Sequence, residues 1–260
     1  MIRRSSAGSS RDPLVGMIVH EDEDVIVVNK PQGMLTSSGP RDARPTLWHI
    51  VHDRGAAQDL QMGIIHRLDR DASGLLVFSK NDQAYHSLKS QFFKHTVDRF
   101  YLAIVTGKPK PPAGKIKSQL IEWKDGSVHT SDEEHKGETA ITHYEVCSAE
   151  GFYSLVRLKL ETGRKHQIRV HLSDLGFPIV GDCLYGKKRA EKKTKNHLAP
   201  TGELMLVAVR LCFDHPRTGK RMKFEVDIPP HMREFLRAIR PQPAPTKPDQ
   251  AQQPKPKHPK

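Results

Sequence analysis

The sequence predicts an α+β domain with a mixed, mostly antiparallel central sheet flanked by helices and loops. Segments with the pattern of strands outnumber segments with the pattern of helices, and several strand segments follow one another directly. A doubly wound parallel sheet would need a helix after nearly every strand. The expected strands are residues 25–31, 74–80, 99–107, 139–147, 155–163, 203–213 and 222–230.

Each strand has a local reason in its side chains. Residues 25–31 (VIVVNKP) form a short apolar run that a proline ends, and residues 99–107 (RFYLAIVTG) are rich in aromatic and β-branched side chains. Residues 139–147 and 155–163 alternate polar and apolar side chains, as strands with one buried face do.

Two segments have the pattern of amphipathic helices. Residues 81–95 begin with an asparagine–aspartate pair that suits a helix N-cap, and their apolar side chains fall on one face. Residues 165–176 also carry one apolar stripe and end at Gly176, a typical C-terminal signal.

Both ends of the chain have the composition of tails. Residues 1–16 are polar and basic, and residues 236–260 are rich in proline and lysine, so neither segment offers enough apolar surface to bury. We therefore expect two disordered tails around one folded domain at residues 17–235. The hydrophobic content of 36% agrees with polar tails around a compact core.

The charge indicates a polyanionic partner. The net charge is +12; residues 1–16 carry +2 and residues 241–260 carry +3, which leaves +7 for the part between them. A folded part that is basic in its own right favours nucleic acid as the partner. Because no apolar run could span a membrane and no secretory signal is visible, we expect a cytoplasmic protein. The three cysteines include no CxxC pair, which argues against a zinc ribbon or a disulfide framework.

The segment HRLDRDASGLLVFSK, residues 66–80, places a cluster of charges directly before a core strand. An aspartate beside arginines stays ionised, so Asp69 or Asp71 suits a nucleophile or a general base better than a general acid. The alternative is a solvated ion-pair network that only closes the turn. The residues of this segment alone leave both interpretations open.

A second cluster lies in LETGRKHQIRVHL, residues 160–172. Arg164, Lys165, Arg169 and the N–H groups of the first helical turn could bind an anion. Ile168 is a neighbour of Arg169 and could pack on an apolar surface while the guanidinium reaches a carboxylate or a phosphate. The two histidines lie five residues apart, which does not suit a metal site, and no metal ligands are expected.

Two further features allow a structural and a functional interpretation. Tyr101, in a predicted strand, fits core packing better than base stacking when the sequence is taken alone. The basic segment 187–195 (KKRAEKKTK) suits a solvated loop or a loop that contacts phosphates. A pair of catalytic acids and a serine nucleophile are both unsupported, because no partner acid is evident and no GxSxG motif occurs.

Five segments in this order resemble the motifs of the RluA-type family of RNA pseudouridine synthases. They are EDEDVIVVNKPQGMLT, GIIHRLDRDASGLLVFSK, VDRFYLAIVTG, LETGRKHQIRVHLSDLGFPIVGDCLYG and LMLVAVRLCFDHPRTGKRMKFEVDIPP. The resemblance implies the pseudouridine synthase catalytic fold for residues 17–235, in a version without the S4 RNA-binding domain that many relatives carry. The departures from the family pattern, which has threonine at the first two positions and histidine at the third, are Ala72, Lys165 and Val207.

The resemblance also implies roles for single residues. Asp69 would be the catalytic aspartate and Arg169 its ion-pair partner. Tyr101 would stack on the target uracil, Ile168 would pack against the base, and Arg67 would hold the flipped nucleotide and its backbone. A phosphate contact and a turn-stabilising carboxylate would come from Arg164 and Asp71.

The implied activity is an isomerisation of uridine in an RNA stem-loop of rRNA or tRNA, by a monomer. Such a reaction requires no redox or energy cofactor, and the target base must leave its stack to be reached. A noncatalytic RNA-binding module with the same fold is the rival hypothesis, and it predicts that Asp69 is dispensable. A nuclease or glycosidase would need metal ligands or a second acid, which the sequence does not offer convincingly.

Overall fold

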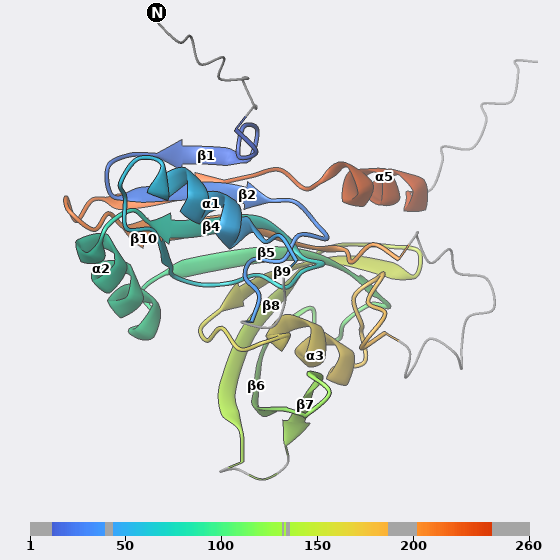
Figure 1. The fold of residues 1–260 in the computed structure, drawn as a ribbon. Helices are drawn as coiled ribbons and strands as arrows, with labels where there is room; N and C mark the ends of the chain where they lie inside the picture. The colour runs from blue at the N-terminus through green and yellow to red at the C-terminus, as the bar shows by residue number, and fades with distance from the viewer. Residues whose placement is uncertain (1–11, 40–43, 132, 134–135, 187–201, 241–260) are drawn as a thin grey trace, which may run out of the picture.

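An eleven-stranded sheet forms the centre of the protein (Figure 1). The computed structural model describes residues 12–39, 44–131, 133, 136–186 and 202–240. The strands are β1 (Ile18–Glu21), β2 (Val25–Lys30), β3 (Gly63–Ile64), β4 (Ser73–Ser79), β5 (Asp98–Thr106), β6 (Ala113–Glu122), β7 (Val128–Ser131), β8 (Glu138–Glu150), β9 (Tyr153–Leu160), β10 (Leu206–Asp214) and β11 (Arg221–Glu225). The helices among the described residues are α1 (Leu47–Ala56), α2 (Asp82–Phe93), α3 (Gln167–Asp174) and α5 (Pro230–Ile239).

The strands follow the order β1-β2-β4-β10-β5-β9-β8-β6-β7, with β11 paired to β10 and β3 paired to β4. The pair β4–β10 is parallel, and the remaining pairs are antiparallel. The predicted mixed, mostly antiparallel sheet is therefore confirmed. All seven predicted strands are present: the ends of six shift by at most three residues, whereas β11 ends at Glu225, five residues before the predicted end.

Strand β4 lies in the middle of the core. All seven of its residues are buried, because β2 and β10 flank it in the sheet and α2 packs against it. Gly74 is required at the contact with β10: its φ is +111°, and a Cβ there would lie 2.3 Å from the carbonyl oxygen of Ala208. The predicted charged segment therefore leads into one of the most enclosed strands of the protein.

The two predicted helices are present, and their ends follow local signals. The side chain of Asn81 accepts a hydrogen bond from the N–H of Ala84 at 2.8 Å and caps α2. Helix α3 ends at Asp174, and Gly176 supplies the expected C-terminal signal: its N–H donates to the carbonyl of Ser173 and that of Phe177 to the carbonyl of Leu172, which is the Schellman arrangement. The start of α3 was predicted two residues too early.

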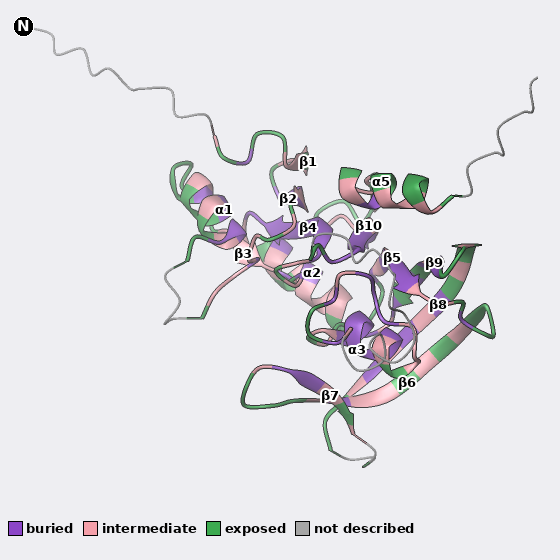
Figure 2. Ribbon diagram, turned by 90° about the vertical axis from the view of Figure 1, so that its right-hand side faces the viewer, coloured by how far each residue is buried: buried purple, intermediate pink, exposed green. Residues whose placement is uncertain are grey.

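Helix α3 is deeply enclosed, whereas α5 lies on the surface (Figure 2). Helix α3 packs against β7 and β8, and all of its residues from Gln167 to Leu172 are buried. It therefore presents its first turn to the interior of the protein.

Both predicted domain ends need correction. Leu14 is fully buried, and Asp12 forms an ion pair with Arg54, so residues 12–16 pack onto the domain. The predicted end at residue 235 falls inside α5, whose Met232 is fully buried. The apolar side chains of α5 hold it on the core, so the folded part continues to Ile239.

Residues 1–11 and 241–260 of the predicted tails lie outside the described residues, as does the basic segment 187–195. Among the helices that the structure describes, none has the length and apolar character that a membrane span requires.

Candidate active site

A cavity of about 870 Å³ opens where the loop before β4, strand β5 and the start of α3 meet. Its volume is within the range of sites that bind small molecules. All six site residues predicted from the sequence line this one cavity: Arg67, Asp69, Tyr101, Arg164, Ile168 and Arg169. The fold thus gathers side chains from three distant segments of the chain.

Asp69 lies in the loop between β3 and β4, and the preceding segment holds this loop in place. The hydroxyl of Thr36 donates to the carbonyl of Leu68 at 2.9 Å and accepts from its N–H at 3.2 Å. The N–H of Ala72 donates to the carbonyl of Asp69 at 3.3 Å and closes a turn. The carboxylate itself is 23% exposed and faces the cavity.

Lys30 also holds the loop between β3 and β4. It is fully buried, and its ammonium donates to the carbonyls of Pro31, Met34 and Arg70 at 3.0, 2.8 and 3.0 Å. Burial lowers the pKa of Lys30 to about 8, although the two aspartates of the loop oppose this shift. The ammonium therefore connects the segment from Pro31 to Met34 with the loop that carries Asp69.

Arg169 connects Asp69 to the interior. Its Nη1 lies 3.3 Å from Oδ2 of Asp69, while Nε and Nη2 donate to the two oxygens of Asp182 at 2.8 and 3.0 Å. Asp182 is 1% exposed and Arg169 is 8% exposed, so this bidentate pair is almost sealed from water. The two carboxylates raise the pKa of Arg169 against the effect of burial, so the guanidinium stays charged.

Tyr185 supports this pair from the other side. The guanidinium of Arg169 lies over the Tyr185 ring, 5.1 Å from its centre. The Tyr185 hydroxyl meets Nδ1 of His166 at 2.7 Å and accepts the N–H of Val128 at 2.9 Å. Asp182 also accepts the N–H of Tyr185, so the turn after α3 is bound to the guanidinium.

Tyr101 and Ile168 supply an apolar part of the cavity. They are 6% and 5% exposed, and they come from β5 and from the first turn of α3. Burial raises the pKa of the Tyr101 hydroxyl, so it is neutral at physiological pH. No residue that the structure describes makes a hydrogen bond to this hydroxyl, so the ring of Tyr101 serves as a surface within the cavity.

The start of α3 differs from the expected open anion site. Arg164 pairs with Glu138 at 2.6 Å, and Lys165 pairs with Glu122 at 2.6 Å. His166, in the left-handed conformation with φ of +52°, precedes the helix. The two cations at the edge of the cavity are thus balanced by carboxylates, which weakens the predicted phosphate contact of Arg164.

The contacts of Asp71 do not fit the expected role of a carboxylate that stabilises the turn. Its two oxygens accept from the side chain of its neighbour Arg70, at 2.8 and 3.1 Å, on the surface. The hydrogen bonds that hold the turn come instead from Lys30, Thr36 and the backbone. The two aspartates of the charged segment are thus separated: Asp69 faces the cavity and Asp71 faces solvent.

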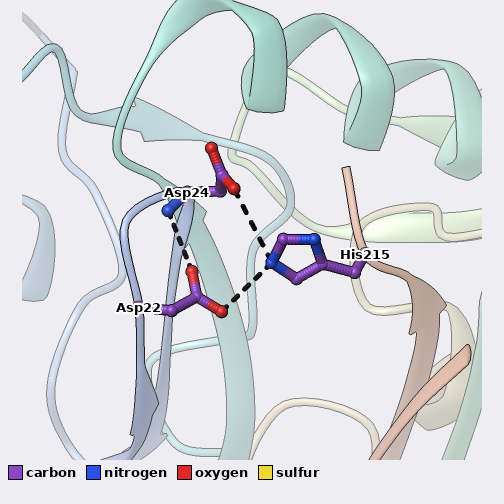
Figure 3. Close-up of side chains that lie close together, drawn as sticks. All are labelled: Asp22, Asp24 and His215. Carbon is purple, nitrogen blue, oxygen red and sulfur yellow. Dashed lines mark hydrogen bonds and ion pairs between the residues drawn. The ribbon is translucent and has the colours of Figure 1, made fainter. Parts of the chain in front are cut away.

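A group of possible metal ligands lies elsewhere. Asp22, Asp24 and His215 bring their side chains together between the β1–β2 turn and the end of β10 (Figure 3). None of them lines the cavity. Arg217 pairs with Asp24 at 2.9 Å and His20 lies 2.7 Å from Asp22, so protein donors already engage both carboxylates. We interpret the group as a hydrogen-bonded joint between the two turns.

The sequence did not single out four of the residues that hold the site: Lys30, Thr36, Asp182 and Tyr185. Two of them, Asp182 and Tyr185, stand in GDCLYG at the end of the fourth family motif. The available signal for Lys30 was a lysine at the end of an apolar strand segment, directly before a proline, because a lysine buried in such a strand needs several hydrogen-bond acceptors. The partner of Asp182 could not be found without the fold.

Comparisons with known proteins identify the family of this chain. The family model described as RNA pseudouridylate synthase matches residues 24–174. An uncharacterized RNA pseudouridine synthase, YlyB of Bacillus subtilis, is 37% identical over 235 residues, which cover 88% of this chain and 74% of the relative. Ribosomal large subunit pseudouridine synthase D of Zymomonas mobilis is 37% identical over 233 residues, which cover 85% of this chain and 72% of the relative.

A solved structure shares the fold. Human RNA pseudouridylate synthase domain containing 4 superposes with a TM-score of 0.72 at 23% identity, over 87% of this chain and 94% of the other. The family match extends over more than half of the chain, and the two curated relatives align over most of their length. The protein is therefore a member of the RluA-type family of RNA pseudouridine synthases, intramolecular isomerases that convert uridine in RNA into pseudouridine.

Proposed function

We propose that this protein modifies uridines of large-subunit ribosomal RNA and that Asp69 is its catalytic carboxylate. The observation that carries the proposal is the position of Asp69: it is the carboxylate of the charged loop that faces the cavity, and a buried arginine holds one of its oxygens. The name of the Zymomonas mobilis relative supports ribosomal RNA as the substrate.

The contacts of Asp69 suit a reactive group. Oδ2 meets Arg169, whereas no residue that the structure describes hydrogen-bonds Oδ1. The free oxygen can approach a nucleotide in the cavity, and the held oxygen fixes the direction of approach. During the reaction uracil leaves the ribose at N1, turns, and is rejoined through C5, so all atoms are retained and no cofactor is needed.

The remaining roles follow from the positions around Asp69. Tyr101 would stack on the flipped uracil, and Ile168 would pack on the base from the first turn of α3. Arg67 would contact the nucleotide backbone, and Arg164 would add a weaker contact. The proposal includes action as a monomer in the cytoplasm, and the bacterial source of the curated relatives supports this location.

A pair of matched substitutions tests the proposal. Asp69→Ala should abolish pseudouridine formation while RNA binding survives, because only the carboxylate is removed. Asp71→Ala should keep most of the activity, since Asp71 contacts only an exposed arginine. Pseudouridines are mapped in rRNA and tRNA from cells with the wild-type protein, with each variant and without the protein.

The possible outcomes separate the parts of the proposal. Equal activity of the two variants would remove Asp69 from catalysis. Loss of pseudouridines in tRNA alone would refute ribosomal RNA as the substrate and leave the isomerase activity intact. Loss of RNA binding together with a collapsed fold in Asp69→Ala would indicate a structural role for this aspartate.

A further inference from the structure

The cations around the cavity fall into two groups. At the start of α3, each cation has a carboxylate partner: Glu138 for Arg164, Glu122 for Lys165, and two aspartates for Arg169. On the side formed by the loop before β4, by α2 and by the start of β5, three cations line the cavity with no such partner among the described residues. They are Arg67, Lys89 and Arg99.

Arg99 is the most enclosed of the three. It is 8% exposed, its Nη2 donates only to the carbonyl of Glu161 at 3.1 Å, and its Nε is buried without a hydrogen-bond partner. Its guanidinium lies 5.4 Å from the centre of the Phe92 ring. Gly163 makes room for it, because a Cβ there would lie 2.4 Å from Nη1. A buried guanidinium with unused donors favours an anionic ligand at this point of the cavity.

Lys89 and Arg67 extend this positive surface toward solvent. Lys89 donates to the carbonyl of Ile65 at 3.0 Å and lies over the ring of Tyr85, so its charge is held but not neutralised. Burial lowers the pKa of Lys89, and the positive charge of nearby Arg67 acts in the same direction. Like charges kept close together favour a polyanionic ligand.

An exposed aromatic ring stands beside these cations. Phe93, the last residue of α2, is 84% exposed and lines the cavity. A ring so open to water covers no part of the core. Cations next to an exposed aromatic face are the combination that binds single-stranded nucleic acid, since phosphates meet the charges and a base stacks on the ring.

We propose that Lys89 and Arg99, next to Arg67, bind the phosphates that flank the target uridine and that Phe93 stacks on a flanking base. This inference rests on the proposed function and deepens it. Arg169 at the start of α3 holds one oxygen of Asp69, and the cations of α2 and β5 are left to hold the RNA strand. The ligand is a short single-stranded segment of RNA, because a paired base cannot stack on a side chain.

Binding of a twelve-nucleotide oligouridine to the full chain tests the inference, measured by fluorescence anisotropy at several KCl concentrations. Lys89→Met and Arg99→Met should each weaken binding about tenfold at low salt. Each should also make the slope of log K against log salt shallower by about 0.7. Phe93→Ala should weaken binding by roughly tenfold with no change in slope, because stacking releases no counterions.

Two lysines provide matched controls. Lys165→Met removes a cation that lines the cavity but is paired with Glu122, so it should change the slope less than Lys89→Met. Lys94→Met removes an exposed cation next to Phe93 that does not line the cavity, and it should change the slope least. Equal slope changes in all three lysine variants would show that the salt dependence reports only the net charge of the protein, and this result would overturn the inference.

The remaining outcomes distinguish failure of the phosphate site from failure of the proposed substrate. Wild-type affinity and slope in folded Lys89→Met refutes the site even if Arg99→Met fails to fold, and thermal unfolding verifies that the variants are folded. Pseudouridine mapping in rRNA is independent of this assay. Wild-type activity in rRNA with unchanged binding in the variants refutes the phosphate site alone. Absence of rRNA modification by the wild type refutes the proposed substrate, and the binding assay still decides the site.

Discussion

Asp182→Asn tests whether the reactive carboxylate depends on the buried pair behind it. The substitution keeps the shape of the side chain and an oxygen that can accept the N–H groups of Leu184 and Tyr185. It removes the charge that Arg169 meets through two hydrogen bonds of 2.8 and 3.0 Å. Removing one partner of a buried ion pair costs about 3–5 kcal/mol in free energy of unfolding.

The effect on activity should be separate from the loss of stability. Asp69 becomes the one carboxylate left to Arg169, and the present separation of 3.3 Å is longer than that of a strong charged hydrogen bond. We expect the guanidinium to move toward Asp69 and to displace the reactive oxygen. A misplacement of about 1 Å can cost about 100-fold in rate, so kcat should fall by about this factor while KM changes little.

The assay needs a control with similar instability and an intact site. Met232→Ala serves this purpose, because Met232 is fully buried in α5 and does not line the cavity. A buried methionine truncated to alanine costs about 2–5 kcal/mol. Urea unfolding gives the stability of both variants, and pseudouridine formation in an rRNA transcript gives kcat at a temperature where both are folded. Equal kcat values for the two variants would refute the positioning role of Asp182.

Three further outcomes are expected. Tyr101→Phe should retain much more activity than Tyr101→Ala, because stacking is worth about 1–3 kcal/mol per base; equal losses would assign the role to the hydroxyl. The kcat should fall as pH rises through about 8, because Lys30 then loses a proton and with it one of the hydrogen bonds that hold the loop of Asp69. A constant kcat from pH 6.5 to 9 would show that Lys30 does not hold this loop. The pKa of Lys30 in the folded state lies below its ordinary 10.5, so above pH 8 the unfolded chain binds more protons than the folded one. This group therefore stabilises the folded state as pH rises, and unfolding would not explain a fall in kcat. Burial lowers the pKa of His171 from 6.5 to about 4, so the unfolded chain takes up the proton first and stability falls by up to about 3 kcal/mol between pH 6.5 and 4. Urea unfolding at pH 7 and pH 4.5 should show a smaller difference for His171→Gln than for the wild type, and an equal difference would contradict this reasoning.

The strands that the sequence predicted are those whose own side chains carry the pattern. Strand β9 alternates buried Val156 and Leu158 with exposed Arg157 and Lys159, and this alternation is visible in the sequence. Strand β6 was missed because it is mostly polar and carries few large apolar side chains. Its pairing with β7 and β8 makes it a strand, and that pairing is tertiary information.

Helix α5 shows a different reason for a missed element. Met232, Phe235, Leu236 and Ile239 have the spacing of one helix face, and all four contact the core. The proline-rich composition of the residues that follow obscured this signal, so the predicted boundary fell inside the helix. Composition averaged over a window is a poor guide to the last turn of a folded domain.

The candidate site was easier to predict than its support. Asp69, Tyr101 and Arg169 stand in short family motifs, and the function that we propose gives Asp69 and Tyr101 direct contact with the nucleotide. Asp182 and Lys30 act through other residues, and their partners are fixed by the path of the chain. A positioning residue is recognised only when the groups that it holds are known.

The division of charge around the cavity answers a problem that a basic active site poses. A carboxylate that must react cannot be bound tightly by every cation that attracts RNA. Here the cation nearest to Asp69 is already shared with Asp182, which limits how strongly Arg169 can hold the reactive oxygen. The cations Lys89 and Arg99 line the same cavity without a carboxylate partner among the described residues, so they can meet phosphates. Catalysis and strand binding can then use positive charge in the same cavity without competing for the same carboxylate.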